Sequence, residues 1–246
     1  MAEFFDQICA VLTENGKKYP GMLADSVVIR EFFSPVPERK PVVSEGENAV
    51  RQKEVSAVTA GGSLNEICVA LEGCSRCPLC RFRNTIVPGE GNEHAGLMFV
   101  GEAPGHEEDL QGRPFVGKAG QLLDKMISAM QFTREEVYIT NIVKCRPQNN
   151  RNPMPEEIAQ CIQFLHRQIE IIRPEVIVAL GAVAAKALLA TENGISKLRG
   201  KWCSYNNIPV MPTFHPAYLL RNESAKRDAW KDLQLVMARF GKTYRR

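Results

Sequence analysis

The sequence predicts an α/β fold: a mostly parallel sheet covered by helices on both faces. Three observations support this prediction. Short apolar runs of strand length alternate with segments of helical periodicity along most of the chain. Hydrophobic residues make up 44% of the sequence, which is enough for a packed core. The length of 246 residues suits one large domain with an appendage, or two small domains.

The strands and helices follow from the apolar patterns in chain order. Ser63 and Glu66 form a capping-box pattern, which predicts a helix through Leu71. Apolar runs predict strands at residues 97–100, 137–143, 176–180 and 208–214. Helical spacing predicts helices at residues 118–130, 155–172, 182–190 and 225–240. Pro155 suits the first position of its helix, because a proline there loses no intrahelical hydrogen bond.

The N-terminal quarter differs from the rest. Residues 1–20 have the apolar spacing of a short amphipathic helix, whereas residues 34–62 combine prolines, glycines and charges without a long apolar pattern. We therefore expect an N-terminal extension over residues 1–62, made of a short helix and a flexible linker, and a main domain over residues 63–246. The extension is a candidate binding site for a protein partner.

Composition limits the cellular context. No apolar run is long enough to span a bilayer, and the N-terminus has no signal-peptide pattern, so we expect a cytoplasmic protein that does not bind membranes. The net charge of +3 permits nucleic-acid binding without arguing for it. Eight cysteines are many for such a chain, and in the cytosol clustered cysteines more often ligate metal or perform chemistry than form disulfides.

Polar motifs follow three of the predicted strands. Residues 101–105 (GEAPG) follow the first strand, Asn141 lies toward the end of the second, and His215 follows the last. In open parallel sheets the ligand binds beyond the carboxyl ends of the strands. Each feature alone is compatible with an ordinary turn or loop, but their shared position predicts one site at this edge.

The cysteines indicate a metal site. Cys74, Cys77 and Cys80 form a C-x-x-C-x-x-C run, and Cys145 and Cys161 lie downstream on one predicted β-α unit. A C-x-x-C turn lets two sulfurs face one ion or cluster. Zinc and an iron–sulfur cluster both suit four cysteines, and Cys80 is either a substitute ligand or a neighbour. Cys9, Cys68 and Cys203 are better explained as buried thiols.

Five motifs together resemble one family. CSRCPL (74–79), GEAPG (101–105), GRPFVGKAGQLLD (112–124), TNIVKCRP (140–147) and HPAYLLR (215–221) are similar, in order and rough spacing, to motifs of the family four uracil-DNA glycosylases. The resemblance covers about residues 64–240. It implies a three-layer α/β/α fold with a four-stranded parallel sheet. It also implies an enzyme that hydrolyses the N-glycosidic bond of uracil in single- or double-stranded DNA, and a 4Fe-4S cluster on Cys74, Cys77, Cys145 and Cys161. We expect the protein to be a monomer.

The same resemblance gives the site residues their expected roles. Phe115 would stack on a uracil flipped out of DNA, and Asn141 would read its edge, because an amide offers a donor beside an acceptor. His215 would donate to the uracil O2 as negative charge develops there. The remaining contacts would come from Gly101, Glu102 and Ala103.

Three roles suit Glu102. It could orient water, favour the developing sugar cation, or crowd the C5 position to exclude thymine. The water-activating aspartate of family one glycosylases has its counterpart at Ala103, so the general base stays open. Glu102 and His215 are nevertheless the predicted catalytic pair.

DNA contacts complete the expected picture. We expect Leu219, Leu220 and Arg221, on a loop, to form a wedge that fills the gap left by the flipped base. A basic group near the cysteines is expected to contact phosphates: Arg81, Arg83, Lys144, Arg146 and Arg151.

Two other functions are alternatives to uracil excision. A covalent trap for uracil DNA is disfavoured because no histidine-bearing basic insert follows Lys144, and a zinc-stapled binding module is the second alternative.

Overall fold

A computed structural model describes residues 62–243. The helix predicted at residues 1–20 lies outside the described residues, and so does the linker predicted at residues 34–62 apart from Gly62. From Leu64 to Arg239 the described chain forms an α/β fold, as the sequence predicts.

One six-stranded sheet forms the middle of the fold, in the order β1-β3-β2-β4-β6-β5. The strands are β1 (Glu90–Gly91), β2 (Leu97–Gly101), β3 (Tyr138–Asn141), β4 (Val176–Leu180), β5 (Cys203–Tyr205) and β6 (Ile208–Thr213). The four inner strands are parallel, which confirms the predicted four-stranded parallel sheet. The two outer strands pair antiparallel and were not predicted, because two or three residues are too few for an apolar pattern.

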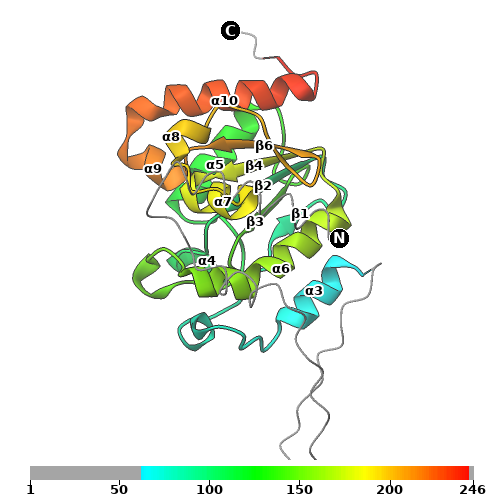
Figure 1. Ribbon diagram of the computed structural model, residues 1–246, viewed down its shortest axis with the longest axis vertical. Coiled ribbons are helices and arrows are strands. Elements are labelled where there is room, and N and C mark those ends of the chain that lie inside the picture. The colour runs from blue at the N-terminus through cyan, green and yellow to red at the C-terminus, as the bar shows by residue number, and fades with distance from the viewer. Residues whose placement is uncertain (1–61, 244–246) are drawn as a thin grey trace, which may run out of the picture. The chain divides into compact units, whose positions relative to one another are not determined.

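Helices cover both faces of this sheet (Figure 1). They are α3 (Leu64–Leu71), α4 (His106–Gln111), α5 (Lys118–Ala129), α6 (Pro155–Ile172), α7 (Gly181–Leu189), α8 (Ile195–Leu198), α9 (Pro216–Arg221) and α10 (Lys226–Arg239). All five predicted helices within the described residues are present, with their ends within one or two residues of the prediction. The short helices α4, α8 and α9 were not predicted.

Two hydrophobic cores lie on opposite faces of the sheet, between the strands and the helices. Met98 and Ile177 point to the face covered by α3, α6 and α7, whereas Phe99 and Val178 point to the face covered by α5 and α10. Figure 1 shows α10 on one side of the sheet and α6 with α3 on the other. Successive strand residues alternate between the two faces, and because both faces are buried the strands are apolar throughout. The result is a three-layer α/β/α arrangement.

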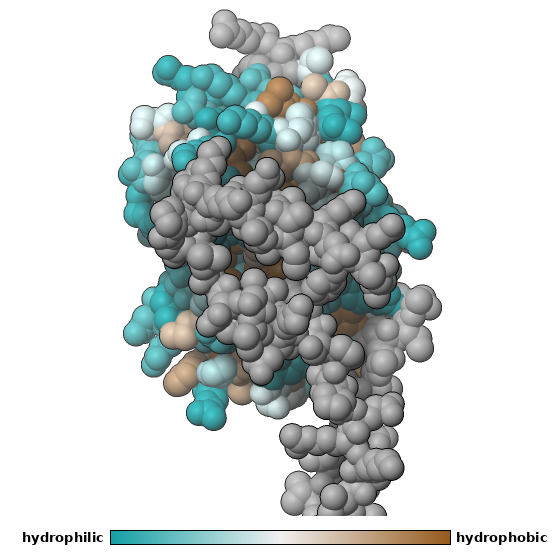
Figure 2. Space-filling model, viewed as in Figure 1, coloured by the Kyte–Doolittle hydropathy of each residue, from teal (hydrophilic) through white to brown (hydrophobic). Residues whose placement is uncertain are grey.

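Local signals set the helix starts. The Ser63 hydroxyl accepts the Glu66 N–H at 3.3 Å and caps α3, and Pro155 occupies the first turn of α6. Within the described residues, no helix is both long enough and apolar enough to cross a bilayer. Where the described residues are visible on the face drawn in Figure 2, most of the surface is hydrophilic.

Candidate active site

A cavity of about 380 Å³ opens at the carboxyl ends of the parallel strands. Its walls include Glu102, Ala103, Phe115, Asn141, His215 and Arg221, so the three motifs expected to converge do share one pocket. A larger cavity of about 710 Å³ lies beside α6 and β5, but it contains none of the predicted site residues. The chemistry therefore favours the smaller cavity as the candidate active site.

Asn141 lies at the floor of this pocket, and Gly101, which was predicted to contact the ligand, lies behind it and does not line the cavity. They are register partners at the ends of β2 and β3. A methyl group on Gly101 would collide with Asn141 Oδ1 and with the Phe115 ring, so this position needs a glycine. Asn141 is 1% exposed, and its Oδ1 has no hydrogen-bond partner among the described residues. Buried polar atoms are rarely left unpaired, so this acceptor is suited to a ligand that donates a hydrogen bond.

Phe115 lies beside Asn141 with an uncommon backbone. Its φ is 52°, in the left-handed region that residues other than glycine seldom adopt. The side chain is 5% exposed, and its ring lies 5.7 Å from the His215 ring, centroid to centroid, at an interplanar angle of 32°. The pocket wall thus presents an aromatic ring next to an imidazole, an arrangement that suits a flat ligand.

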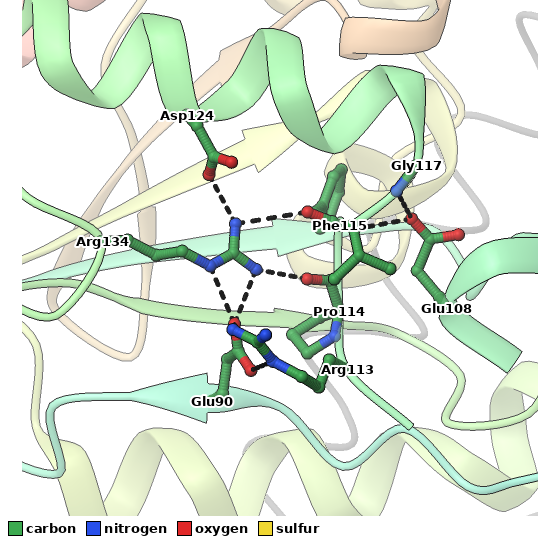
Figure 3. A network of polar contacts seen from close by, with 9 residues as sticks. Glu90, Glu108, Arg113, Pro114, Phe115, Gly117, Asp124 and Arg134 are labelled. Carbon is green, nitrogen blue, oxygen red and sulfur yellow. Dashed lines mark hydrogen bonds and ion pairs between the residues drawn. The ribbon is translucent and has the colours of Figure 1, made fainter. Parts of the chain in front are cut away.

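Two side chains that the sequence analysis missed hold the peptide groups around Phe115 (Figure 3). Arg134 donates to the carbonyl oxygens of Pro114 and Phe115, while Glu108 accepts the N–H groups of Val116 and Gly117. Arg134 lies outside every motif, so no pattern points to it. Glu108 does carry a signal, because a glutamate three residues after Gly105 has capping-box spacing.

His215 caps α9. Its Nδ1 accepts the N–H of Ala217 at 3.1 Å, so the single proton of the neutral ring is on Nε2. Burial, and then the positive charge of Arg221, lower the pKa of His215 from 6.5 to about 4. At neutral pH the pocket therefore contains an uncharged imidazole whose Nε2–H is free to donate to a ligand.

Glu102 follows directly on β2 and lines the same cavity. It is half-buried, and burial raises the pKa of its carboxyl above 4.5. The loop that carries it is fixed to the next strand, because the carbonyls of Gly101 and Glu102 accept the N–H groups of Ile142 and Val143 at 2.9 and 3.2 Å. The carboxyl group of Glu102 and the neutral donor of His215 therefore line the same cavity.

The predicted DNA wedge lies on helix α9 and not on a loop. Leu219 is 1% exposed and belongs to the core, so we remove it from the wedge. Leu220 is 44% exposed and Arg221 is exposed, and Tyr218, a residue not predicted for this surface, is 40% exposed and lines the cavity. The accessible part of the predicted wedge is therefore Leu220 with Arg221.

The predicted cysteine ligands gather around a third, very small cavity. Cys74, Cys77, Cys145 and Cys161 all line it, together with Cys80. Arg83 Nη1 lies 3.2 Å from Cys145 Sγ, and the backbone N–H of Lys144 lies 3.3 Å from Cys161 Sγ. Burial raises the pKa values of the Cys77 and Cys161 thiols, and it raises that of Cys145 to about 11.

The chemistry of these side chains, though not their arrangement in this structure, suits a metal cluster. Thiolates are the ligands of iron–sulfur clusters and of structural zinc, and hydrogen bonds to the sulfurs are part of such sites. Among the described residues, no group of three or more histidine, cysteine or acidic side chains is suited to hold a metal ion as it stands. The shared cavity and the two hydrogen bonds to sulfur are therefore the structural basis for any metal assignment.

Four of the five basic residues expected at phosphates have partners within the protein, and two of them, Lys144 and Arg83, do not face solvent freely. Lys144 is fully buried, and its Nζ donates to Thr140 Oγ1, the Asn141 carbonyl and Gln168 Oε1 at 2.6–2.8 Å. The prediction that Lys144 contacts phosphate is therefore wrong, because a buried ammonium group cannot reach DNA. Arg83 bonds to sulfur instead of facing solvent freely.

Comparisons with known proteins identify the family of this chain. The family model of the uracil DNA glycosylase superfamily matches residues 88–234. A type-4 uracil-DNA glycosylase of Thermotoga maritima is 53% identical over 153 residues, which is 61% of this chain and 80% of that protein. The type-4 enzyme of Saccharolobus solfataricus is 44% identical over 183 residues, 71% of this chain and 85% of that protein.

A third relative extends the agreement. The type-4 uracil-DNA glycosylase of Archaeoglobus fulgidus is 42% identical over 188 residues, which is 73% of this chain and 94% of that protein. The matches include the strands that carry Asn141 and His215 to the pocket. This chain belongs to the uracil-DNA glycosylase superfamily, and within it to the type-4 family.

Proposed function

We infer that this chain is a uracil-DNA glycosylase, a hydrolase that flips uracil out of DNA and cleaves its N-glycosidic bond to leave an abasic site. The observation that carries this inference is the unpartnered Oδ1 of Asn141 on the floor of the pocket. Family membership supports it. The role is that of a repair enzyme acting on deaminated cytosine.

Base recognition follows from Asn141 and Phe115. The Asn141 acceptor suits N3–H of uracil, whereas cytosine has an acceptor at N3 and would be repelled. The Phe115 ring offers a face on which the flipped base stacks, which helps to offset the few kcal/mol that unstacking costs. Gly101 lets both side chains approach the base closely.

Bond cleavage uses the two polar walls. His215, neutral and protonated on Nε2, donates to uracil O2 and stabilises the anion that leaves. The imidazole donates a hydrogen bond without transferring its proton, so the ring does not have to be protonated again between turnovers. Glu102 supplies a negative charge on the same cavity, and we assign it to the water or to the developing sugar cation.

DNA contacts lie around the cavity. Leu220 and Arg221 on α9 are accessible for the proposed wedge, and Arg81 is an exposed candidate for a phosphate contact. Arg146 and Arg151 have partners within the protein but keep exposed surface: Arg146 Nε donates to Asn150, and Arg151 pairs with Glu157 at 2.6 Å. We propose that the protein acts as a monomer.

For the cysteine site we propose a 4Fe-4S cluster held by Cys74, Cys77, Cys145 and Cys161. Their common cavity and the two donors aimed at sulfur support this assignment. When bound, the cluster supplies a structural link between the turn before η1 (Pro78–Arg81), the loop after β3, and α6. Cleavage of a glycosidic bond needs no electron transfer. Zinc remains the alternative metal, and iron content decides between them.

The extension has a separate role in this proposal. We assign the glycosylase domain to residues 63–246, and we assign residues 1–62 to the binding of a protein partner.

One assay tests the activity. A DNA strand containing a single uracil is incubated with the protein and then treated with alkali, which cleaves abasic sites. We expect cleavage at the uracil position and none in the same strand with thymine or cytosine. No cleavage at uracil by protein with its full metal content would overturn the proposed function.

A variant tests the proposed role of Asn141 in base recognition. Asn141→Asp replaces the amide donor of the side chain with a second acceptor. We expect uracil excision to fall and discrimination against cytosine to weaken, because the new acceptor suits the cytosine N4–H. Excision rates on uracil and cytosine strands measure both effects. A wild-type rate on uracil would show that Asn141 is not the reader.

A further inference from the structure

The peptide groups around Phe115 are unusually well fixed. Four consecutive residues each have one backbone group bonded to one of two side chains: the carbonyls of Pro114 and Phe115 to Arg134, and the N–H groups of Val116 and Gly117 to Glu108. Figure 3 shows the two side chains approaching this segment from opposite sides. Neither belongs to the recognition or cleavage steps described above.

Arg134 is itself held in place. Its Nη1 lies 2.6 Å from Asp124 Oδ1 on α5, and its Nε lies 2.8 Å from Glu90 Oε1 on β1. The side chain is only 17% exposed. A guanidinium presents its donors in a rigid planar fork, so one arginine can reach two carboxylates and two carbonyls at once. Arg134 thus connects the Phe115 segment to two elements of the fold.

Glu108 joins two walls of the pocket. Its Oε1 accepts from Val116 and Gly117 at 2.9 Å each, and its Oε2 accepts the N–H of Gly105 at 3.1 Å. Gly105 ends the GEAPG motif that carries Glu102. Glu108 itself is buried, with 9% of its surface exposed. One carboxylate therefore sets the spacing between the loop of Glu102 and the loop of Phe115.

The backbone of Phe115 explains why such fixing is needed. Phe115 has a φ of 52°, and for a residue with a side chain this conformation is disfavoured on the order of tenfold or more relative to the common backbone regions. Such conformations persist only where the surroundings impose them. The backbone conformation also sets the direction of the Cα–Cβ bond, and so the place from which the ring reaches into the pocket. Gly120 contributes too, because a methyl group there would collide with the Phe115 peptide.

We propose that Glu108 and Arg134 are positioning residues that hold Phe115 as the stacking platform and fix its distance from the Glu102 loop. This inference rests on the proposed uracil-DNA glycosylase function. It predicts that both residues act on binding of the flipped base, and not on contacts with the DNA backbone.

The test compares two DNA strands in binding assays with the full chain. One strand contains a uracil nucleotide made resistant to cleavage by 2′-fluorine, and the other contains an abasic analogue at the same place. The ratio of their dissociation constants measures what the flipped base contributes. A merely structural role would weaken both strands alike and leave the ratio unchanged.

Arg134→Lys keeps the charge but loses the fork, because one ammonium cannot reach two carbonyls and two carboxylates. We expect affinity for the uracil strand to fall about tenfold, in the range of base–aromatic stacking, with abasic-strand affinity unchanged. The matched control is Arg113→Lys. Arg113 pairs with the same Glu90 at 2.8 Å, but its side chain is 58% exposed, and Glu90 is the residue it bonds to within the described part of the chain.

Glu108 gives the second, independent measurement, which also serves if Arg134→Lys does not fold. Glu108→Gln keeps one oxygen for Val116 and Gly117 but turns a donor toward the Gly105 N–H, so we expect a smaller loss than for Glu108→Ala. Glu107→Gln, on the exposed face of the same helix, is the control. This graded order would support positioning through both oxygens.

The outcomes separate the two inferences. Wild-type ratios in both folded variants, or equal losses on both strands, would overturn the positioning role while leaving the proposed function intact. A wild-type protein that excises no uracil from an ordinary uracil strand would overturn the proposed function, and the positioning role with it.

Discussion

The base pocket and the cysteine site lie next to each other along the chain but are built on different principles. Asn141 ends β3, and Cys145 follows only four residues later. In the pocket, side chains of the protein itself fix the geometry: Arg134 and Glu108 hold the Phe115 segment, and the Ala217 N–H orients His215. The cysteine site brings together buried thiols with raised pKa values, which bind a metal only after they lose their protons.

This difference teaches where each region obtains its order. Glu102, Asn141 and His215 come from strand ends and are placed by the sheet, whereas Phe115 lies on a loop that Arg134 and Glu108 hold. The cysteines come from a turn, a loop and a helix, and four thiols do not hold one another together. We therefore expect changes at the cysteines to affect stability first, and changes in the pocket to affect rate first.

The largest expected effect is at the cysteine site. Cys145→Ala should remove the proposed cluster, lowering the iron content from about four per chain to below one. It should also destabilise the domain by several kcal/mol, by analogy with structural metal sites, which contribute about 10 kcal/mol or more. Metal analysis and urea unfolding measure both. Cys203→Ala, a half-buried thiol outside the small cavity, is the control. Stoichiometric zinc without iron in the wild type would contradict the cluster.

The next effect is on catalysis. His215→Ala should slow single-turnover cleavage by about 10²–10³-fold, the usual loss for one donor to a developing oxyanion. Substrate affinity should change little, because this bond strengthens mainly in the transition state. His166→Ala is a matched control, since His166 is half-buried on α6 and lines the other large cavity. Unchanged cleavage in His215→Ala would move the active site elsewhere.

Glu102 provides a smaller effect and a dependence on pH. Glu102→Gln keeps the shape without the charge, so we expect a rate loss of about 10²-fold, the low end for a general acid or base, if the carboxylate acts on water or on the sugar. Burial raises the pKa of Glu102, so wild-type activity should decline as the pH falls through a value above 4.5. His215 does not titrate until about pH 4, so that limb should vanish in Glu102→Gln.

The outcome of this variant also decides between the roles of Glu102. A steric gate against thymine would leave Glu102→Gln near the wild-type rate on uracil at every pH. Single-turnover rates from pH 4.5 to 8 for both proteins distinguish the two roles. The pocket would then discriminate by charge at one wall and by shape at another.

The smallest effect is expected outside both regions. Deleting residues 1–60 should leave metal content and excision on short oligonucleotides nearly unchanged, because the family match begins at residue 88 and the motifs at residue 74. Loss should appear only in binding of a protein partner or in stability. A truncated protein without metal and without activity would show that the extension is part of the catalytic domain.

Much of the fold was predictable, and particular elements show why. The strand at residues 176–180 and the helix at residues 155–172 were predicted to the residue, because the apolar run and the proline at the first turn are local signals. The edge strand Cys203–Tyr205 was missed, although Asn206 and Asn207 adopt the positive φ of a tight hairpin turn. Asparagine pairs at such turns were the signal that could have found it.

The sequence by itself determined the alternation of strands and helices, the edge where Glu102, Asn141 and His215 meet, and four cysteines, Cys74, Cys77, Cys145 and Cys161, that line one cavity. These depend on local periodicity and on motifs of fixed spacing. Only the tertiary structure decided that Leu219 and Lys144 are buried and that Arg134 and Glu108 hold Phe115. Burial and hydrogen-bond partners depend on which distant segments pack together, and a long polar side chain carries no local mark of the backbone it will reach.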